Sequence, residues 1–244
     1  MISFLSFGSE KISAIDIGHY AAKVVQLQKM NDDSIKLLKA GRINLPQNVI
    51  NEGEIVDSSL VVRNLENLFN QINFKPDKAV TTVSCKSVIV RNISLPKMPE
   101  EELKEALKWE ADDYLPYSVE EAVFDYIMVN KSITEDEYNL IMVAASRSTI
   151  DSYVSILEEL YIEPLAVNVQ GMALLSILSF QDVLVGPTAI IDIGASATQI
   201  TIANKRDIML SRTIDTGGTS FTNSIMDFKN IDFKEAEEEK KKID

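Results

Sequence analysis

The chain has 244 residues but a single cysteine, Cys85, and a single histidine, His19. One cysteine cannot form an internal disulfide, and one cysteine with one histidine is too few for a structural zinc site. Basic side chains are also in deficit, because 24 Lys and Arg are outnumbered by 37 Asp and Glu, for a net charge of −13. A nucleic-acid-binding protein needs a basic surface patch, and the sequence shows none, so we expect no nucleic-acid partner.

Long hydrophobic stretches are absent as well, since no apolar run approaches the roughly 18 residues that a membrane span needs. Residues 1–8 are apolar but carry neither the basic leader nor the cleavage pattern of a secretory signal. We therefore expect a cytoplasmic protein that reaches a membrane through a partner, or weakly through Phe4, Leu5 and Phe7. The composition, 45% hydrophobic and 25% charged, is typical of a globular protein with a sizeable core.

The spacing of apolar residues predicts interleaved strands and helices, the pattern of an α/β fold, and the first three strands should form an antiparallel meander. Strands are predicted over residues 11–17, 22–29, 35–45, 79–85, 88–93, 122–130, 138–145, 164–169, 188–194, 198–203 and 208–214, with a polar turn at 131–137. Helices are predicted over residues 58–72, from Pro99 until Pro116, and over 149–161, 172–178 and 219–228. Ser58 or Ser59 should cap the first helix, Cys85 should be a buried strand thiol, and residues 172–178 should be buried on all sides.

The tetrapeptide Ile-Asp-Ile-Gly occurs twice, at residues 15–18 and 191–194. Each copy ends a predicted strand, and each is followed by an alternating strand, a third strand and a helix. A chance match of four residues would not reproduce this order of elements around both copies. The repeat therefore indicates a duplication that produced two related α/β halves facing each other.

Each copy combines an aspartate at a buried strand end with a glycine that allows a tight turn, whose exposed N–H groups suit phosphate oxygens. Two facing hairpins would hold a polyphosphate from both sides, and Asp16 and Asp192 would hold Mg²⁺ mostly through water. Either copy alone favours a plain hairpin turn, whereas both copies together with Gly217-Gly218, which opens a helix at Thr219 with free N–H groups, favour phosphate binding. The predicted phosphate-binding residues are Asp16, Gly18, His19, Lys23, Asp192, Gly194, Ala195, Ser196, Thr198, Gly217 and Gly218.

These hairpins resemble the phosphate loops of the actin-like ATPase superfamily, and the chain is most similar to its PilM family of type IV pilus assembly proteins. The most specific resemblance is to the insertion typical of that family, carried by residues 94–103, 109–111, 114–117 and 125–126. The resemblance implies an α/β, duplicated ribonuclease-H-like (actin-like) fold with an inserted small α+β subdomain and an incomplete second half. Residues 1–85 and 146–182 would form the first half, 86–145 the insertion, and 183–244 the start of the second half.

The resemblance also implies a cytoplasmic scaffold that binds ATP and Mg²⁺, holds the cytoplasmic tail of the membrane protein PilN, and lies at the inner membrane through that partner. Other pilus assembly proteins and further copies of the chain are expected contacts. The exposed edge of a small inserted sheet suggests a peptide groove between the insertion and the first half, lined by Val90, Ile93, Leu95, Leu115 and Tyr117. Because the family continues beyond Asp244 with an adenosine-binding loop, we expect a truncated or split form that binds ATP weakly or not at all alone.

Several residues depart from the family pattern. His19 and Tyr20 occupy a turn where small hydroxyl residues are usual, and Asn168 and Gln170 stand where acidic residues are common. Amides cannot act as general bases, so we expect at most a slow ATPase.

Two alternatives stay open. A sugar or metabolite kinase would need a catalytic aspartate, and none of Asp57, Asp77 and Asp125 lies in a glycine-rich turn. An FtsA-like division protein usually has an amphipathic C-terminal anchor, whereas residues 234–244 are charged all round. That run predicts a solvated helix with pairs Glu237–Lys241 and Glu238–Lys242.

Overall fold

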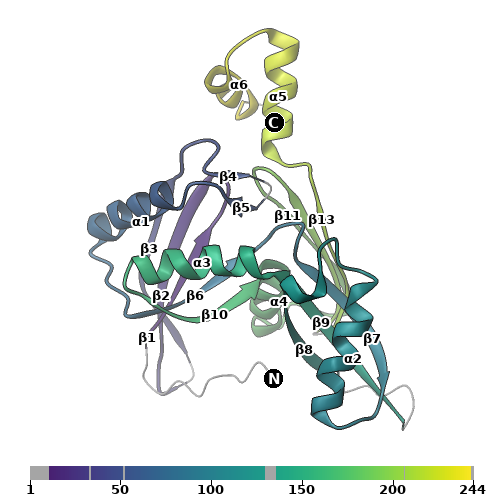
Figure 1. Cartoon of the computed structure of the whole chain (residues 1–244). Helices are drawn as coiled ribbons and strands as arrows, with labels where there is room; N and C mark the ends of the chain where they lie inside the picture. Colours follow the sequence, from purple (N-terminus) through teal and green to yellow (C-terminus); the bar gives the residue numbers. More distant parts are fainter. Residues whose placement is uncertain (1–10, 33, 52, 130–135, 206, 243–244) are drawn as a thin grey trace.

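The structure is a computed structural model that describes residues 11–242, except residues 33, 52, 130–135 and 206. Phe4, Leu5 and Phe7, and most of the predicted turn at 131–137, lie outside the described residues. Within the described part, the chain forms a five-stranded sheet, two three-stranded sheets, a short hairpin and six α-helices (Figure 1). None of the helices in this part is long and apolar enough to cross a membrane.

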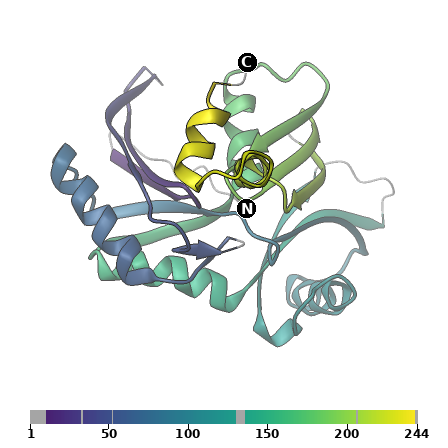
Figure 2. The same ribbon diagram turned by 90° about the horizontal axis from the view of Figure 1, so that it is seen from above.

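The largest sheet has the strand order β10-β6-β1-β2-β3. Its strands are β1 (Lys11–Ile17), β2 (Ala21–Lys29), β3 (Ile35–Asn44), β6 (Lys78–Val83) and β10 (Glu163–Val169). The first three form the predicted antiparallel meander, whereas β6 and β10 add to β1 in parallel. Helices α1 (Ser58–Ile72) and α3 (Arg147–Glu159) contact each other and bury the main hydrophobic core against this sheet (Figure 2).

Helix α1 has the predicted bounds but a different cap. The carboxylate of Asp57 accepts a hydrogen bond from the backbone N–H of Leu60 at 2.9 Å. Ser58 and Ser59 already lie inside the first turn, so the prediction that one of them caps the helix is wrong. An aspartate cap places a negative charge at the positive end of the helix dipole.

A second sheet repeats the meander, with β11 (Pro187–Ile193), β12 (Thr198–Asn204) and β13 (Asp207–Ile214) all antiparallel. Helix α5 (Gly218–Lys229) follows, as the repeat predicts. Helix α4 (Gln170–Phe180) contacts strands of both sheets. It is not buried on all sides, because Met172 and Leu175 face the sheets while Phe180 is 60% exposed.

The third sheet has the order β7-β9-β8 and packs against its own helix. The elements are β7 (Ile89–Pro96), α2 (Glu100–Asp112), the 3₁₀ turn Val119–Glu121, β8 (Ala122–Val129) and β9 (Glu137–Ser146). Helix α2 ends at Asp112, before the predicted stop at Pro116. Strands β4 (Ile50–Asn51) and β5 (Glu54–Ile55) form the short hairpin, and Cys85 is buried but lies beyond the end of β6.

The charged C-terminal run forms α6 (Phe233–Lys240), which packs against α5. Ala236 is fully buried, and the Lys240 ammonium donates to the carbonyl of Gly218 at 3.0 Å and to the hydroxyl of Thr222 at 2.8 Å. The run therefore forms a helix with the expected solvated face, but its other face packs on α5, so it is not charged on every side. Within this run the ion pairs are Glu237–Lys240, Glu238–Lys241 and Glu239–Lys242, three residues apart in sequence instead of the predicted four.

Candidate functional site

The two Ile-Asp-Ile-Gly copies end equivalent strands. Asp16 on β1 lies opposite Lys23 on β2, and Asp192 on β11 lies opposite Gln199 on β12, at the same place in the second meander. Side chains directly opposite in antiparallel strands lie on the same face of the sheet. The duplication seen in the sequence is thus a duplication of three-dimensional structure.

Both turns also close in the same way. The Gly18 N–H donates to the carbonyl of Ala21 at 3.1 Å, and the Gly194 N–H donates to the carbonyl of Ala197 at 2.9 Å. A Cβ at position 194 would lie 2.9 Å from that carbonyl oxygen, which is closer than real Cβ contacts. The second glycine is therefore required by the tightness of the turn.

Both hairpins line one cleft of about 230 Å³. Of the residues predicted to bind phosphate, the structure brings eight to this cleft: Asp16, Gly18, His19, Lys23, Asp192, Gly194, Ala195 and Ser196. Further lining residues that the sequence did not single out as binding residues include Tyr20, Arg42, Thr82, Ser84, Tyr153 and Gln170. The two repeated aspartates, distant in sequence, therefore face one cavity.

The two carboxylates have different partners. Asp16 forms a salt bridge with Lys23 at 2.6 Å and accepts a longer hydrogen bond from the hydroxyl of Thr82 at 3.3 Å. Asp192 accepts a hydrogen bond from the side-chain amide of Gln170, at the start of α4. Gln170 therefore binds the second aspartate rather than standing free as a water-activating group.

Thr198, Gly217 and Gly218 are not among the residues that line the cleft. The Thr198 hydroxyl donates to the carbonyl of Thr216 at 2.6 Å. The N–H groups of Gly218 and Thr219 donate to the carbonyls of the second turn, at 2.9 and 2.7 Å. The expectation that these amides are free for an anion is wrong, because they hold the start of α5 against the hairpin.

A Cβ at position 217 would lie 2.6 Å from the carbonyl oxygen of Ala195. Only glycine allows so close an approach between the start of α5 and the turn. Gly217 thus lets the start of α5 pack directly against the second turn.

The turns retain donors for a ligand. Among the described residues, the backbone N–H groups of His19, Ala195 and Ser196 donate to no protein acceptor. Consecutive unused N–H groups in a turn suit phosphate oxygens, and the carboxylates and amide oxygens nearby are the ligands that hydrated Mg²⁺ prefers. In the described part of the chain, no three His, Cys, Asp or Glu side chains form a group able to hold a metal. Asp16 and Asp192 are the two repeated carboxylates that line this cleft.

Burial lowers the pKa of His19 below its usual value. Burial thus favours the neutral imidazole over the imidazolium. The lining cations are Lys23 and Arg42.

The five residues predicted to line a partner groove do not share one surface. Ile93, Leu95 and Leu115 pack into the core between the third sheet and α2. Val90 lies on the opposite face of β7, in a cluster with residues of α4 and the second sheet. Val90 therefore cannot line the same groove as Ile93 and Leu95, because residues an odd number of positions apart on a strand point to opposite faces.

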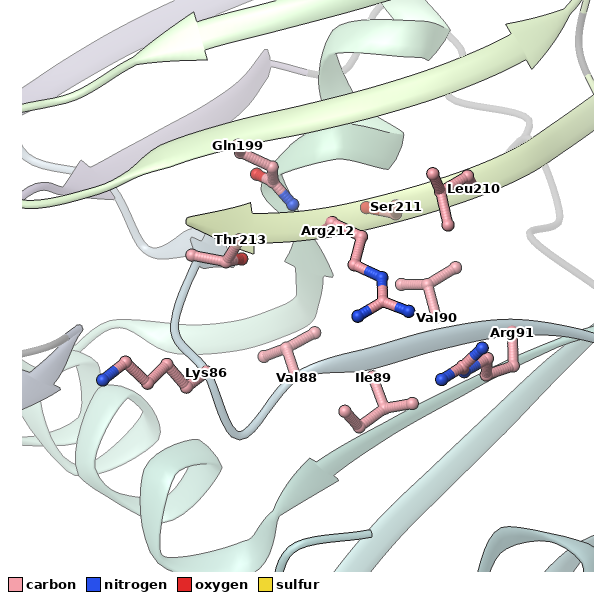
Figure 3. Close-up of a pocket in the computed structure, with 10 residues that line it drawn as sticks. All are labelled: Lys86, Val88, Ile89, Val90, Arg91, Gln199, Leu210, Ser211, Arg212 and Thr213. Carbon is pink, nitrogen blue, oxygen red and sulfur yellow. The ribbon is translucent and has the colours of Figure 1, made fainter. Parts of the chain in front are cut away.

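The outer edge of β7 is also covered. Asn92 donates to the carbonyls of Ile208 and Met209 on β13, at 2.8 and 3.1 Å, and Lys86 forms a salt bridge with Asp215 at 2.8 Å. These contacts bracket a small cavity of about 170 Å³ between the two edge strands (Figure 3). The β7 edge therefore faces the second sheet and is not an open site for an added peptide strand.

Tyr117 lines a different cavity of about 520 Å³, between the third sheet and α3. Its hydroxyl donates to the carbonyl of Ser87 at 2.6 Å. Burial, with a smaller contribution from nearby Cys85, raises the pKa of Tyr117 to about 12. The charged residues around this cavity are mostly acidic: Glu54, Glu120, Glu121 and Asp151, against Arg147.

The family described as "Type IV pilus assembly protein PilM" matches residues 14–244. The chain belongs to the PilM family. The match includes both hairpins, the third sheet with α2, and the α5–α6 pair. It does not favour the sugar-kinase or FtsA-like alternatives.

Solved structures share the fold of this PilM-family protein. The "PilM-PilN type IV pilus biogenesis complex" matches with a TM-score of 0.87 and 24% identity over 96% of this chain and 70% of that chain. The ethanolamine utilization protein EutJ from Carboxydothermus hydrogenoformans has a TM-score of 0.54 and 12% identity, over 95% and 61% of the two chains. The cytoplasmic domain of EpsL, an inner-membrane component of the Vibrio cholerae type II secretion system, has a TM-score of 0.50 and 9% identity, over 88% of this chain and 75% of that chain. The α/β, actin-like fold class that the family resemblance implied is confirmed.

Proposed function

We propose that this PilM-family protein is a nucleotide-binding scaffold of type IV pilus assembly that holds the cytoplasmic tail of PilN. The observation that carries the nucleotide half is the convergence of two equivalent Asp-Gly hairpins on one cleft. Free turn amides would hold phosphate oxygens, and Asp16 and Asp192 would hold Mg²⁺ through water. The bound metal would offset the charge of the phosphates.

Hydrolysis is proposed to be slow or absent. The amide of Gln170 hydrogen-bonds Asp192, at a position where an acidic residue would be needed to activate water. An amide does not accept a proton near neutral pH, so it cannot serve as a general base. The bound nucleotide would then serve to stabilise a conformation of the scaffold, and its hydrolysis would not be needed.

The PilN tail is proposed to bind at the cavity beside Tyr117, between the third sheet and α3. This cavity keeps the place expected from the sequence, between the insertion and the first half, and the residue Tyr117, but not the other four lining residues. Four carboxylates and one guanidinium surround it, so a peptide with basic residues would be favoured. Binding there would place the protein at the inner membrane through its partner.

The domain division expected from the sequence is part of the same proposal. Residues 86–145 have a separate core cluster around α2, which supports an inserted subdomain. A second cluster joins Val90 and Ile141 of that segment to α4 and to Ala203 and Ile208 of the second sheet. This cluster would be the junction of the three units.

The test is titration of the full chain with a synthetic peptide of the cytoplasmic tail from the PilN-like protein of the same genome, followed by fluorescence anisotropy. Saturable binding that weakens with salt is expected. The double variant Glu120→Gln/Glu121→Gln should weaken binding several-fold, about the effect of removing exposed ion pairs. The matched control Glu101→Gln/Glu102→Gln, on exposed positions of α2, should not. No binding by the unchanged chain would overturn the partner proposal.

A further inference from the structure

The cleft contains a row of three charged side chains across three strands. Asp16 on β1 lies opposite Lys23 on β2, and Lys23 lies opposite Arg42 on β3. Residues opposite one another in antiparallel strands share a face, and all three line the same cleft. The sheet therefore presents one carboxylate and two cations, side by side, toward the second hairpin.

Two like charges directly opposite one another on a sheet repel and destabilise it. The Asp16 carboxylate neutralises Lys23 at 2.6 Å, which leaves the charge of Arg42 to be balanced. The described contact of Arg42 is with an uncharged group, the ring of Tyr20, whose centroid lies 5.5 Å from the guanidinium carbon. Among the residues that the structure describes, no carboxylate forms a salt bridge with the exposed Arg42 guanidinium, which lies beside Lys23 at the cleft.

The contact with Tyr20 holds Arg42 over the first turn. Tyr20 belongs to this turn, next to His19, whose backbone N–H is free for a ligand. A guanidinium over an aromatic ring still has its N–H donors, and these match the oxygens of a phosphate bidentately. Tyr20, a bulky residue where the family pattern has a small one, thus contacts Arg42.

We propose that Arg42 is a phosphate-binding residue that forms, with Lys23, a two-cation clamp on the polyphosphate chain of the ligand at the first hairpin. The proposal rests on the nucleotide half of the proposed function and adds to it a residue outside both repeats. When Mg²⁺ takes up the Asp16 carboxylate, Lys23 becomes available to the same phosphates as Arg42. The ligand group recognised is the phosphate chain, not the base or the sugar.

The experiment titrates the full chain with Mg-ATP, with inorganic triphosphate plus Mg²⁺, and with adenosine, using calorimetry and amide NMR shifts. Arg42→Ala should weaken ATP and triphosphate alike, by about tenfold or more, the effect of losing hydrogen bonds to a charged group. Any adenosine affinity should not change. Arg42→Lys should recover part of the loss, because it keeps the charge but not the bidentate edge.

Arg63→Ala is the matched control, since Arg63 is exposed on α1, outside the lining of the cleft, and its loss changes the net charge equally. Equal affinities for Arg42→Ala and the unchanged chain would overturn the clamp while leaving the proposed function standing. Equal weakening by Arg42→Ala and Arg63→Ala would also overturn it, because the effect would then be general electrostatics. Absence of inorganic triphosphate binding by the unchanged chain would overturn the nucleotide half of the proposed function and the clamp with it.

Discussion

Asp16 and Asp192 occupy the same position in two equivalent hairpins, yet Asp16 is paired with a cation and Asp192 with a neutral amide. The residue opposite Asp192, Gln199, instead accepts a long hydrogen bond from Ser84 at 3.5 Å. The duplicated site is therefore electrically asymmetric. The first hairpin carries its own counter-charge, whereas the second presents a carboxylate whose negative charge is not balanced by its hydrogen-bond partner.

Removing either carboxylate should selectively affect the metal-dependent part of nucleotide binding. Asp16→Asn and Asp192→Asn are each expected to weaken ATP binding in the presence of Mg²⁺, because they remove ligands for its water shell. Without Mg²⁺ the same variants should bind ATP as well as the unchanged chain or better, since a negative charge is gone. Calorimetry with and without EDTA measures both, with exposed Asp227→Asn as the control. Equal losses in both conditions would contradict a metal role.

Gly217→Ala should destabilise the protein. Its Cβ would lie 2.6 Å from the carbonyl of Ala195, so the turn or the start of α5 must move. The expected loss in the free energy of unfolding is about 1–3 kcal/mol, as for other overpacked sites. Gly186→Ala is the control, because a Cβ there meets nothing within 4 Å. The measurement is urea denaturation, and equal midpoints for the two variants would refute the close contact.

The α5–α6 pair should depend on a partly buried ionic cluster. Burial favours the neutral form of Glu237, but hydrogen bonds from Lys240 and Thr222 outweigh it and lower the pKa of Glu237 below its usual 4.5. A lowered carboxyl pKa stabilises the folded state above pH 4.5, and this contribution is lost as the pH falls through the lowered value. α6 should therefore detach from α5 in acid before the rest of the structure unfolds.

Hydrogen exchange tests this cluster. Lys240→Met should speed exchange in residues 233–240 at pH 7, whereas Lys241→Met, whose partner pair is largely exposed, should leave it nearly unchanged. In Lys240→Met the acid dependence of exchange should also shrink. The same exchange rates in both variants would show that the Lys240 contacts do not hold α6.

The Tyr117 hydroxyl should stabilise the contact between the loop before β8 and the loop before β7. Tyr117→Phe removes its bond to the carbonyl of Ser87 and is expected to cost about 0.5–1.5 kcal/mol. Since the pKa of Tyr117 is raised to about 12, this contribution is fully present below pH 10.0 and is lost as the pH rises toward 12. Denaturation at pH 7 and above pH 10 measures the difference. A gap between the two proteins that stays constant with pH would contradict the buried phenol.

Much of the fold was predictable because it is local. The meander, the bounds of α1 and the repeat of both hairpins follow from alternation, helical spacing and glycine at the turns. The cap of α1 was missed by one residue, since Asp57 and Ser58 are both good caps and neighbouring contacts decide between them. The exposed side of α4 was missed because an apolar sequence does not reveal how many neighbours a helix has.

The residues of the candidate site that lie in the repeated hairpins were predictable from the sequence, whereas those that other elements bring to the cleft were not. Gln170 and Arg42 come from a helix start and a third strand, and no motif links either to the hairpins. The register across β1, β2 and β3 is the signal that places Arg42 beside Lys23, and a register shift in β2–β3 hides it from simple counting. The β7 residues expected in the partner groove were misplaced for a related reason, because β7 faces β13 through contacts such as Asn92 with Ile208.

The paired hairpins of this PilM-family protein follow from local sequence alone, since a strand, an aspartate and a turn glycine are set by neighbours along the chain. Three other features follow from tertiary contacts. These are which groups share the cleft, that the N–H groups of Gly218 and Thr219 are already hydrogen-bonded, and which edge of the third sheet is covered. These depend on contacts between segments far apart in the chain. Their geometry follows from how the sheets and helices pack together, and periodicity does not encode it.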